Sequence, residues 1–158
     1  MKSLFKILHI WVFLPLFGCG FAVLDKSQIS RTTIQEIKSE GENKINFLIK
    51  NNLYSLIKSK EPVDFITLEL KTNKTKSIKE KNQRNKITKY NIIIDSNIKI
   101  KFSNKKISEE VNVKAEGYYD VSDEHNTTRE NQKRLELKLS NEISKKIVAA
   151  IIKLTNDY

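Results

Sequence analysis

The single cysteine of the chain, Cys19, is the residue whose surroundings point most directly to a chemical reaction. A thiolate is a good nucleophile, and glycines on both sides leave the backbone accessible to a processing enzyme. Residues 1–6 carry two lysines and no acid, and the run from Ile7 to Phe17 is almost entirely apolar. A basic segment, a short apolar segment and small residues follow one another in this way in a secretory signal peptide. The apolar run is shorter than the roughly 20 residues that a membrane-spanning helix needs.

The four residues Leu16-Phe17-Gly18-Cys19 resemble the bacterial lipobox, which has leucine three residues before the cysteine and a small residue directly before it. The resemblance implies that Cys19 becomes the acylated first residue of a mature lipoprotein. More than one acyl chain is enough for stable membrane attachment. Phe17 is bulkier than the usual residue at its position, and an ordinary secreted protein with an inert thiol is the alternative. Gly20 stands where the familiar inner-membrane retention signal has aspartate, which favours the outer membrane.

These features divide the chain into three expected segments. Residues 1–18 form a signal peptide that is removed, residues 19–31 form the lipidated N-terminus and a tether, and residues 32–158 form one domain. Acylation would consume the only thiol, so the rest of the protein would have no disulfide, no thiolate metal ligand and no cysteine nucleophile. Removal of the signal peptide takes away two lysines and no acid, which lowers the formal charge from +10 to +8.

Basic residues crowd one predicted connection between strands, and Glu80 is the only acid among them. They are Lys71, Lys74, Lys76, Lys79, Lys81, Arg84, Lys86 and Lys89. A loop of this kind can bind phosphate groups, and Arg84 is the best single candidate because its planar fork can chelate a phosphate. Arg129, near the start of the last predicted helix, is a further candidate, with an ordinary surface charge as the alternative.

The lysine excess also has an explanation that requires no ligand. The chain has 25 lysines and 4 arginines and is rich in isoleucine and asparagine, as any protein of an A/T-rich genome would be. A solvated loop is therefore the alternative to a phosphate-binding one. Base readout favours arginine, and no zinc-finger, helix-turn-helix or RRM pattern is present, so we expect no nucleic-acid partner.

The remaining polar residues give little support for catalysis. Asp120, Asp123, Glu124 and His125 match no zinc or calcium spacing, and we expect them to form a turn and the start of a helix instead of a metal site. His125 is the only histidine after the signal peptide, and no G-x-S-x-G, H-E-x-x-H or P-loop motif occurs. We therefore expect neither an enzyme nor a cofactor.

Apolar periodicity predicts the elements that position these residues. Apolar side chains recur at three- and four-residue spacing over residues 42–58, which predicts an amphipathic helix that stops before Pro62. Ser39 and Glu42 match a capping box at its start. Residues 32–38 show a weak strand pattern before it. The apolar residues that recur in the predicted helix are Ile45, Leu48, Ile49, Leu53, Leu56 and Ile57.

Alternation predicts three further strands. The first starts at Asp64, and the longest alternation, over residues 90–102, is broken only by Ile93 and Ser96. A tight polar turn, SNKK at residues 103–106, leads into a partner strand over residues 107–117. Two long alternating strands with a short turn predict an antiparallel hairpin with one buried face and one wet face.

The last predicted element is a helix over residues 128–155, opened by a capping box from Thr127 to Glu130. Its apolar residues fall on one stripe. The predicted order is therefore β-α-β-β-β-α, in which each helix and the sheet have one apolar face. The expected fold class is α+β, a two-layer sandwich of two helices packed on a mixed four-stranded sheet.

A lipobox followed by this element order resembles the LPS-assembly lipoprotein family LptE over nearly the whole chain. The resemblance lies in the order and spacing of the elements. The matching segments are CGF at 19–21, the helix ending near LIKNNLYSL, the strand KYNIIIDSNIKIKF, the hairpin partner ending EGYYDV, and a polar stretch that leads into a C-terminal helix.

Members of that family plug the lumen of the outer-membrane barrel LptD, assist its assembly, and bind lipopolysaccharide during its insertion into the outer leaflet. The resemblance implies the same partners, with a lipid anchor holding the domain on the periplasmic side of the outer membrane. Tyr118 or Tyr119 would contact the barrel wall while the other faces the core. A membrane-tethered periplasmic lipid carrier or transporter-associated lipoprotein is the alternative. The residues implied to meet lipopolysaccharide phosphates are Lys74, Lys76, Lys79, Lys81, Arg84, Lys86 and Arg129.

Overall fold

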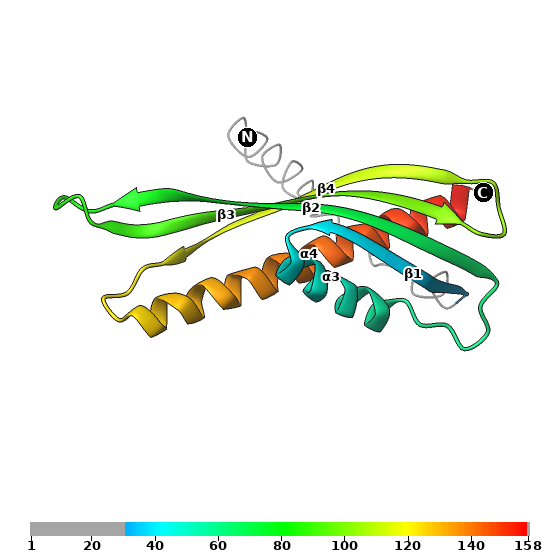
Figure 1. Ribbon diagram of the computed structural model, residues 1–158, viewed down its shortest axis with the longest axis horizontal. Coiled ribbons are helices and arrows are strands. Elements are labelled where there is room, and N and C mark those ends of the chain that lie inside the picture. The colour runs from blue at the N-terminus through cyan, green and yellow to red at the C-terminus, as the bar shows by residue number, and fades with distance from the viewer. Residues whose placement is uncertain (1–30, 158) are drawn as a thin grey trace, which may run out of the picture.

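The computed structural model describes residues 31–157, so the predicted signal peptide and Cys19 lie outside the described residues. Figure 1 shows the sheet as one layer with both helices on the same side of it. The predicted α+β sandwich and its element order are confirmed. The elements are β1 (Thr32–Gly41), α3 (Asn43–Leu56), β2 (Asp64–Lys81), β3 (Ile87–Phe102), β4 (Ser108–Asp120) and α4 (His125–Asp157).

The sheet is mixed, as predicted, and its strands lie in the order β1-β2-β3-β4. β1 runs parallel to β2, and α3 supplies the crossover that a parallel pair requires. β2, β3 and β4 form an antiparallel meander. β2 and β3 are the longest strands, and their hairpin projects beyond the first turn of α4 in Figure 1.

The core lies between the sheet and the two helices. From Ile92 to Phe102, the even-numbered residues of β3 face the helices and are buried, including Ser96, whereas Ile93 lies on the other face. Ser96 and Ile93, the two exceptions to the predicted alternation, therefore follow the regular strand geometry. Ser96 is a polar residue on the buried face, and Ile93 is an apolar residue on the other face. The Oγ of Ser96 lies 3.0 Å from the Oγ1 of Thr72 in β2, so each hydroxyl has a partner inside the core.

The weak pattern of β1 has a structural cause. The register between β1 and β2 shifts between Ile34 and Glu36, which marks Gln35 as a bulge. The bulge places Ile34 and Ile37 on the buried face although they are three residues apart. A strict period of two is broken at the bulge, which explains why the strand pattern over residues 32–38 is weak.

The prediction that the lysine-rich stretch connects two strands as a loop is wrong for most of its length. β2 continues to Lys81 and pairs with β3 along the whole stretch, so only residues 82–86 form the turn. Asn82 closes this turn, because its Oδ1 accepts hydrogen bonds from the amides of Arg84 and Lys86, both at 3.0 Å. Asn85 adopts a positive φ of 59°, which asparagine tolerates in turns. Lysine-rich sequence looks like a loop, but long backbone pairing with β3 holds it as a strand.

The predicted capping box before the first helix is also wrong. Ser39 belongs to β1, and Glu42 is itself the N-cap, without a side-chain cap hydrogen bond. The chain turns from strand to helix at Gly41, whose φ is 95°. The amide of Glu42 then donates to the carbonyl of Thr72 at 3.0 Å, so the backbone of β2 takes the place of a capping side chain.

The second predicted capping box fails for a different reason. α4 begins at His125, before Thr127, so Thr127 lies inside the first turn. The neighbouring hydroxyl of Thr128 accepts a hydrogen bond from the amide of Ser122 at 2.9 Å, which fixes the entry into the helix. The predicted role of the acidic stretch as a turn and helix start is otherwise in agreement with the structure.

Candidate functional site

The predicted basic cluster is divided by the two faces of β2. Lys74 and Lys76 occupy even positions and lie on the side of the helices, where they contact Glu136 and Gln132 of α4. Lys79 lies on the open side, with its ammonium 3.8 Å from the centre of the Tyr118 ring. A loop could have gathered these cations around one ligand, whereas the strand directs them to opposite faces.

A buried carboxylate draws three elements together beneath β2. The side chain of Glu136 in α4 is 1% exposed. It accepts hydrogen bonds from Lys44 of α3 at 2.6 Å and from Lys74 of β2 at 3.4 Å, and Gln132 donates to it at 2.9 Å. Lys74 also donates to Glu42 at 2.8 Å. Lys74 is therefore committed to an internal ion-pair network and is poorly placed to bind an external phosphate.

The ion-pair network shifts the pKa values of Glu136 and Lys74 in opposite directions. Burial raises the pKa of the Glu136 carboxyl, but hydrogen bonds from Lys44 and Gln132, with the charges of the two lysines, hold that pKa below its ordinary value. Burial lowers the pKa of the Lys74 ammonium, but its bonds and charge interactions with Glu42 and Glu136 raise that pKa above its ordinary value. Both groups are therefore charged at neutral pH.

Lys76 lies over an aromatic pair on the same face. Its ammonium is 3.9 Å from the centre of the Tyr90 ring and 5.5 Å from that of Tyr119. The two rings stack with centres 5.7 Å apart. The Tyr119 hydroxyl donates to Gln132 at 3.0 Å. Tyr119 is buried and Tyr118 is 54% exposed, so the expectation that one of the adjacent tyrosines faces the core is confirmed.

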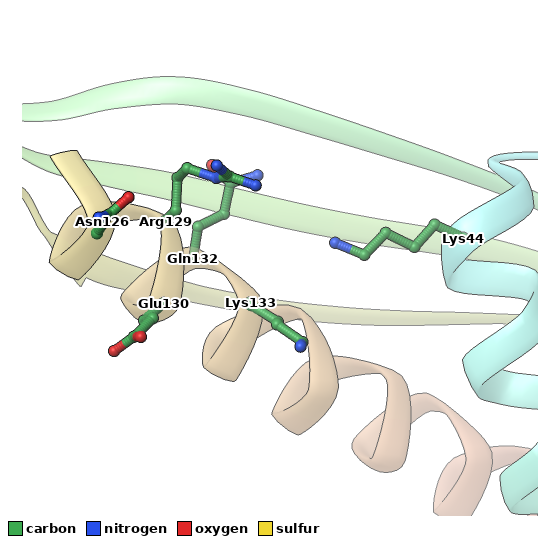
Figure 2. Close-up of a pocket in the computed structure, with 6 residues that line it drawn as sticks. All are labelled: Lys44, Asn126, Arg129, Glu130, Gln132 and Lys133. Carbon is green, nitrogen blue, oxygen red and sulfur yellow. The ribbon is translucent and has the colours of Figure 1, made fainter.

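Two adjoining cavities open between the hairpin and the first half of α4. A cavity of about 350 Å³ is lined by Lys76 of β2 and Arg129 of α4, together with Tyr90 and His125. A second, of about 500 Å³, is lined by Lys44, Asn126, Arg129, Glu130, Gln132 and Lys133. Figure 2 shows Lys44 reaching from α3 toward Arg129 and Gln132 of α4. We call the two together the basic cleft, because its cations outnumber its acids and can attract an anionic group.

Besides Lys79 on the open face, three more of the predicted phosphate-binding residues lie away from the basic cleft. Lys81, Arg84 and Lys86 belong to the end of the β2–β3 hairpin, where the Lys81 ammonium donates to Asn85 at 3.0 Å. Arg84 lines a shallow cavity there with Asn82 and Gln83. The structure therefore brings Lys76 together with Arg129, and it separates both from Arg84.

Sequence reasoning missed four residues in and behind the cleft. Lys44, Gln132 and Lys133 line the cleft, and Glu136 is bonded to Lys44 and Gln132; all four lie on helices. A signal was present, because Glu136 falls one residue after Leu135 on the apolar stripe of α4, where a carboxylate needs a partner. Its cationic partners come from α3 and β2, 92 and 62 residues away, and no local pattern links them.

The open face of the sheet is polar, and α3 and α4, the two helices within residues 31–157, both lie on its other side (Figure 1). Side-chain pairs cross it from strand to strand: Lys101 donates to Glu69 at 2.6 Å, and Asn97 donates to Glu110 at 3.1 Å. The hydrogen bond from Lys101 is the largest influence on the Glu69 carboxyl and lowers its pKa. This face therefore presents both charges and amides to its surroundings.

Two further observations concern the part of the chain that the structure describes. Residues 31–157 contain no group of three histidine, cysteine or acidic side chains arranged to hold a metal ion. None of the helices in that range combines the length and the apolar character that crossing a membrane requires. The predicted lipidation site, Cys19, lies outside it.

Comparison with solved structures identifies proteins with the same arrangement of two helices on a four-stranded sheet. A putative lipoprotein from Caulobacter crescentus CB15 superimposes with a TM-score of 0.62 over 84% of this chain and 96% of that one, at 13% identity. The fold is shared with bacterial lipoproteins. Rare lipoprotein B from Shewanella oneidensis gives a TM-score of 0.57 at 10% identity and covers 77% of this chain and 97% of its own.

A minor lipoprotein from Acinetobacter baumannii has the same fold, with a TM-score of 0.55 at 12% identity over 78% of this chain and 92% of that one. This LptE-like architecture is the one that the sequence resemblance implied. No protein-family model and no curated protein matches the sequence. At these identities the likeness concerns the fold.

Proposed function

We propose that this chain is a non-enzymatic, lipid-anchored protein of the outer membrane that plugs a large LptD-type β-barrel and assists its assembly. The same domain would bind lipopolysaccharide on its way to the outer leaflet. The fold shared with rare lipoprotein B and other bacterial lipoproteins supports a lipoprotein of this kind. The lipobox at Cys19 supports its anchoring on the periplasmic side.

One observation carries the proposal most directly: an open sheet face that is polar along its whole width. The lumen of a large outer-membrane barrel is polar and filled with water, so a plug must offer hydrogen-bonding groups to the wall. The open face has such groups on every strand, among them Lys38, Glu69, Asn97 and Lys114. The helices cover the opposite face, so within residues 31–157 this one is left to meet a partner.

The basic cleft supplies the second part of the proposed function. Arginine and lysine bind phosphate through charge-assisted hydrogen bonds. Arg129 lines both cavities of the cleft, and Lys44, Lys76 and Lys133 surround it. Arg129 is therefore the candidate we favour for contact with lipopolysaccharide phosphates, in place of Arg84, which lies in the hairpin turn.

Co-purification tests the proposal. The chain would be tagged at its C-terminus, expressed from its own signal sequence, and extracted from membranes in a mild detergent. We expect a large barrel protein to elute with it, and we expect barrel assembly to fail when the chain is depleted. The matched control is the Cys19→Ala variant, which would lose the acyl mass at the mature N-terminus in mass spectrometry. Recovery of the chain alone, together with normal barrel assembly in its absence, would refute the proposal.

A further inference from the structure

The main chain of β2 has an unpaired edge where β1 ends. The last pair between the two strands is Gly41 with Thr72, after which the chain leaves the sheet to form α3. β2 continues to Lys81, paired only with β3. Within residues 31–157, no other strand lies beside this part of β2, so one side of its backbone is open.

Two backbone hydrogen bonds establish which residues face that opening. The carbonyl of Thr72 accepts from Glu42 on the β1 side, and the carbonyl of Phe65 accepts from Ser103 on the β3 side. Backbone groups of a strand alternate between its two sides, and no bulge interrupts β2 between these positions and Ile78. The amides and carbonyls of Lys74, Lys76 and Ile78 therefore point to the open edge. Those of the residues between them are bonded to β3.

The outer edge of the sheet at β4 is different, because side chains already bond to it. The ammonium of Lys146 donates to the carbonyl of Lys114 at 2.6 Å, and the amide of Asn131 donates to the carbonyl of Asp120 at 3.1 Å. No side chain among the described residues makes such a bond to the three open residues of β2. An unpaired edge of this kind is a template for an added strand.

The side chains around the open edge of β2 are mostly cationic, so they favour an acidic partner strand. Lys76 and Lys79 flank it on the two faces, and the basic cleft opens beneath it with Lys44, Arg129 and Lys133. The side chain of Lys76 reaches Gln132 in the wall of the cleft, which shows that edge and cleft adjoin. A strand laid along the edge would direct alternate side chains into the cleft.

We propose that the edge of β2 from Lys74 to Ile78 binds an extended acidic segment of another protein by strand addition. Its backbone would pair with the three open residues, in line with β1. Alternate glutamate or aspartate side chains would meet the cations of the cleft. A second copy of this chain is a poor occupant, because it would place lysines against lysines. The inference stands independently of the proposed barrel and lipopolysaccharide roles.

Amide hydrogen exchange on the full chain in mild detergent tests this inference. The probe is a fluorescein-labelled peptide of alternating glutamate and valine, about eight residues long, a usual strand length. We expect the peptide to slow exchange at the amides of Lys76 and Ile78, and not at Thr75 and Ser77, which β3 already protects. Alternating protection is specific to strand addition, because a bound anion would have no reason to produce it.

Two matched comparisons make the test decisive. By fluorescence anisotropy, Lys76→Glu should weaken peptide binding about tenfold, whereas Lys106→Glu, an equal charge change in the turn at the other end of the sheet, should leave it unchanged. The same peptide with alternate amides N-methylated keeps its charge and should lose binding. Equal binding of the methylated peptide would show an anion site only and would overturn the inference.

The remaining outcomes also overturn it. No binding by the acidic peptide would mean that the edge accepts no strand of this chemistry. Protection of the edge without peptide that rises with protein concentration would identify a second copy as the occupant. Protection without peptide at every concentration would show that residues of the same chain cover the edge.

Discussion

Glu136 is a buried charged residue beside the apolar stripe of α4. Its carboxylate is taken out of water and then shared between ammonium groups of α3 and β2. Removing one partner of a buried ion pair costs more than the pair contributes, because the other charges remain without compensation. Glu136 is thus a positioning residue, since it holds Lys44 and Gln132, two residues that line the basic cleft.

Replacing Glu136 with alanine should lower the free energy of unfolding by about 2 kcal/mol, because Lys74 would lose a buried counter-ion. Urea denaturation followed by circular dichroism measures the change. The matched control is Glu142→Ala, which breaks an exposed pair with Lys146 and should cost about 0.5 kcal/mol or less. Equal losses for the two variants would contradict the internal network.

The same network predicts a pH dependence. The pKa of Glu136 is lower in the folded protein, so its stabilisation is present above the ordinary glutamate value of 4.5 and is lost as pH falls through the folded pKa. The pKa of Lys74 is raised, so its contribution is present below its ordinary value of 10.5 and is lost as pH rises through the folded pKa. The stability difference between wild type and Glu136→Gln should therefore shrink at both extremes. A constant difference in urea titrations from acid to alkaline pH would argue against it.

At the scale of elements, the passage from β1 to α3 depends on one glycine. Gly41 has a φ of 95°, and a Cβ on it would lie 2.0 Å from the carbonyl oxygen of Thr72. That oxygen belongs to the backbone of β2 and accepts the first amide of the turn. No side chain can be accommodated without separating the strand pair.

Gly41→Ala should lower stability by about 3 kcal/mol, because it combines a strained backbone with a collision against a fixed strand. Gly117→Ala in β4 is the comparison: its Cβ would meet the Cδ1 of Leu135 at 2.8 Å, the end of a flexible side chain that can move, at a cost of about 1 kcal/mol. Thermal unfolding of both variants measures the difference. A smaller loss at Gly41 than at Gly117 would contradict the geometry.

The elements also show what the sequence can and cannot predict. β3 was predicted correctly because its apolar residues alternate over its whole length, and α4 because its stripe is long. The outer half of β2 was not predicted as a strand. It projects as a hairpin rich in lysine and threonine, and neither of its faces is apolar, so its sequence lacks the alternation of apolar and polar residues. Its strand character comes from pairing with β3, and pairing is a property of two segments. For the same reason the cluster of cations was predicted but its division between two faces was not.

At the scale of the whole molecule, the two arginines considered for phosphate binding, Arg129 and Arg84, line separate cavities. The basic cleft lies between the hairpin and the helices, whereas Arg84 lies in the turn at the end of the hairpin. Figure 1 shows this end projecting past the helical layer. The two places can therefore be tested separately for any anionic ligand.

If lipopolysaccharide phosphates enter the cleft, Arg129→Gln should weaken lipopolysaccharide binding about tenfold, the value of one charge-assisted contact. Arg84→Gln removes the same charge from the hairpin turn and should leave the affinity unchanged. Binding of labelled lipopolysaccharide to each variant, repeated at two salt concentrations, measures both effects. A loss of affinity for Arg84→Gln with none for Arg129→Gln would instead place the lipopolysaccharide site in the hairpin turn.

The parallel position of β1 has a consequence for the order in which the molecule is built. β2, β3 and β4 each pair with the strand that follows or precedes them along the chain, so their hairpins close by short loops. β1 precedes them in the chain, yet its only neighbour in the sheet is β2, and the two can pair only after α3 has brought them together. Until then Ile34 and Ile37 have no cover. During folding, β1 must therefore wait for its partner, and in this interval its apolar side chains are open to aggregation.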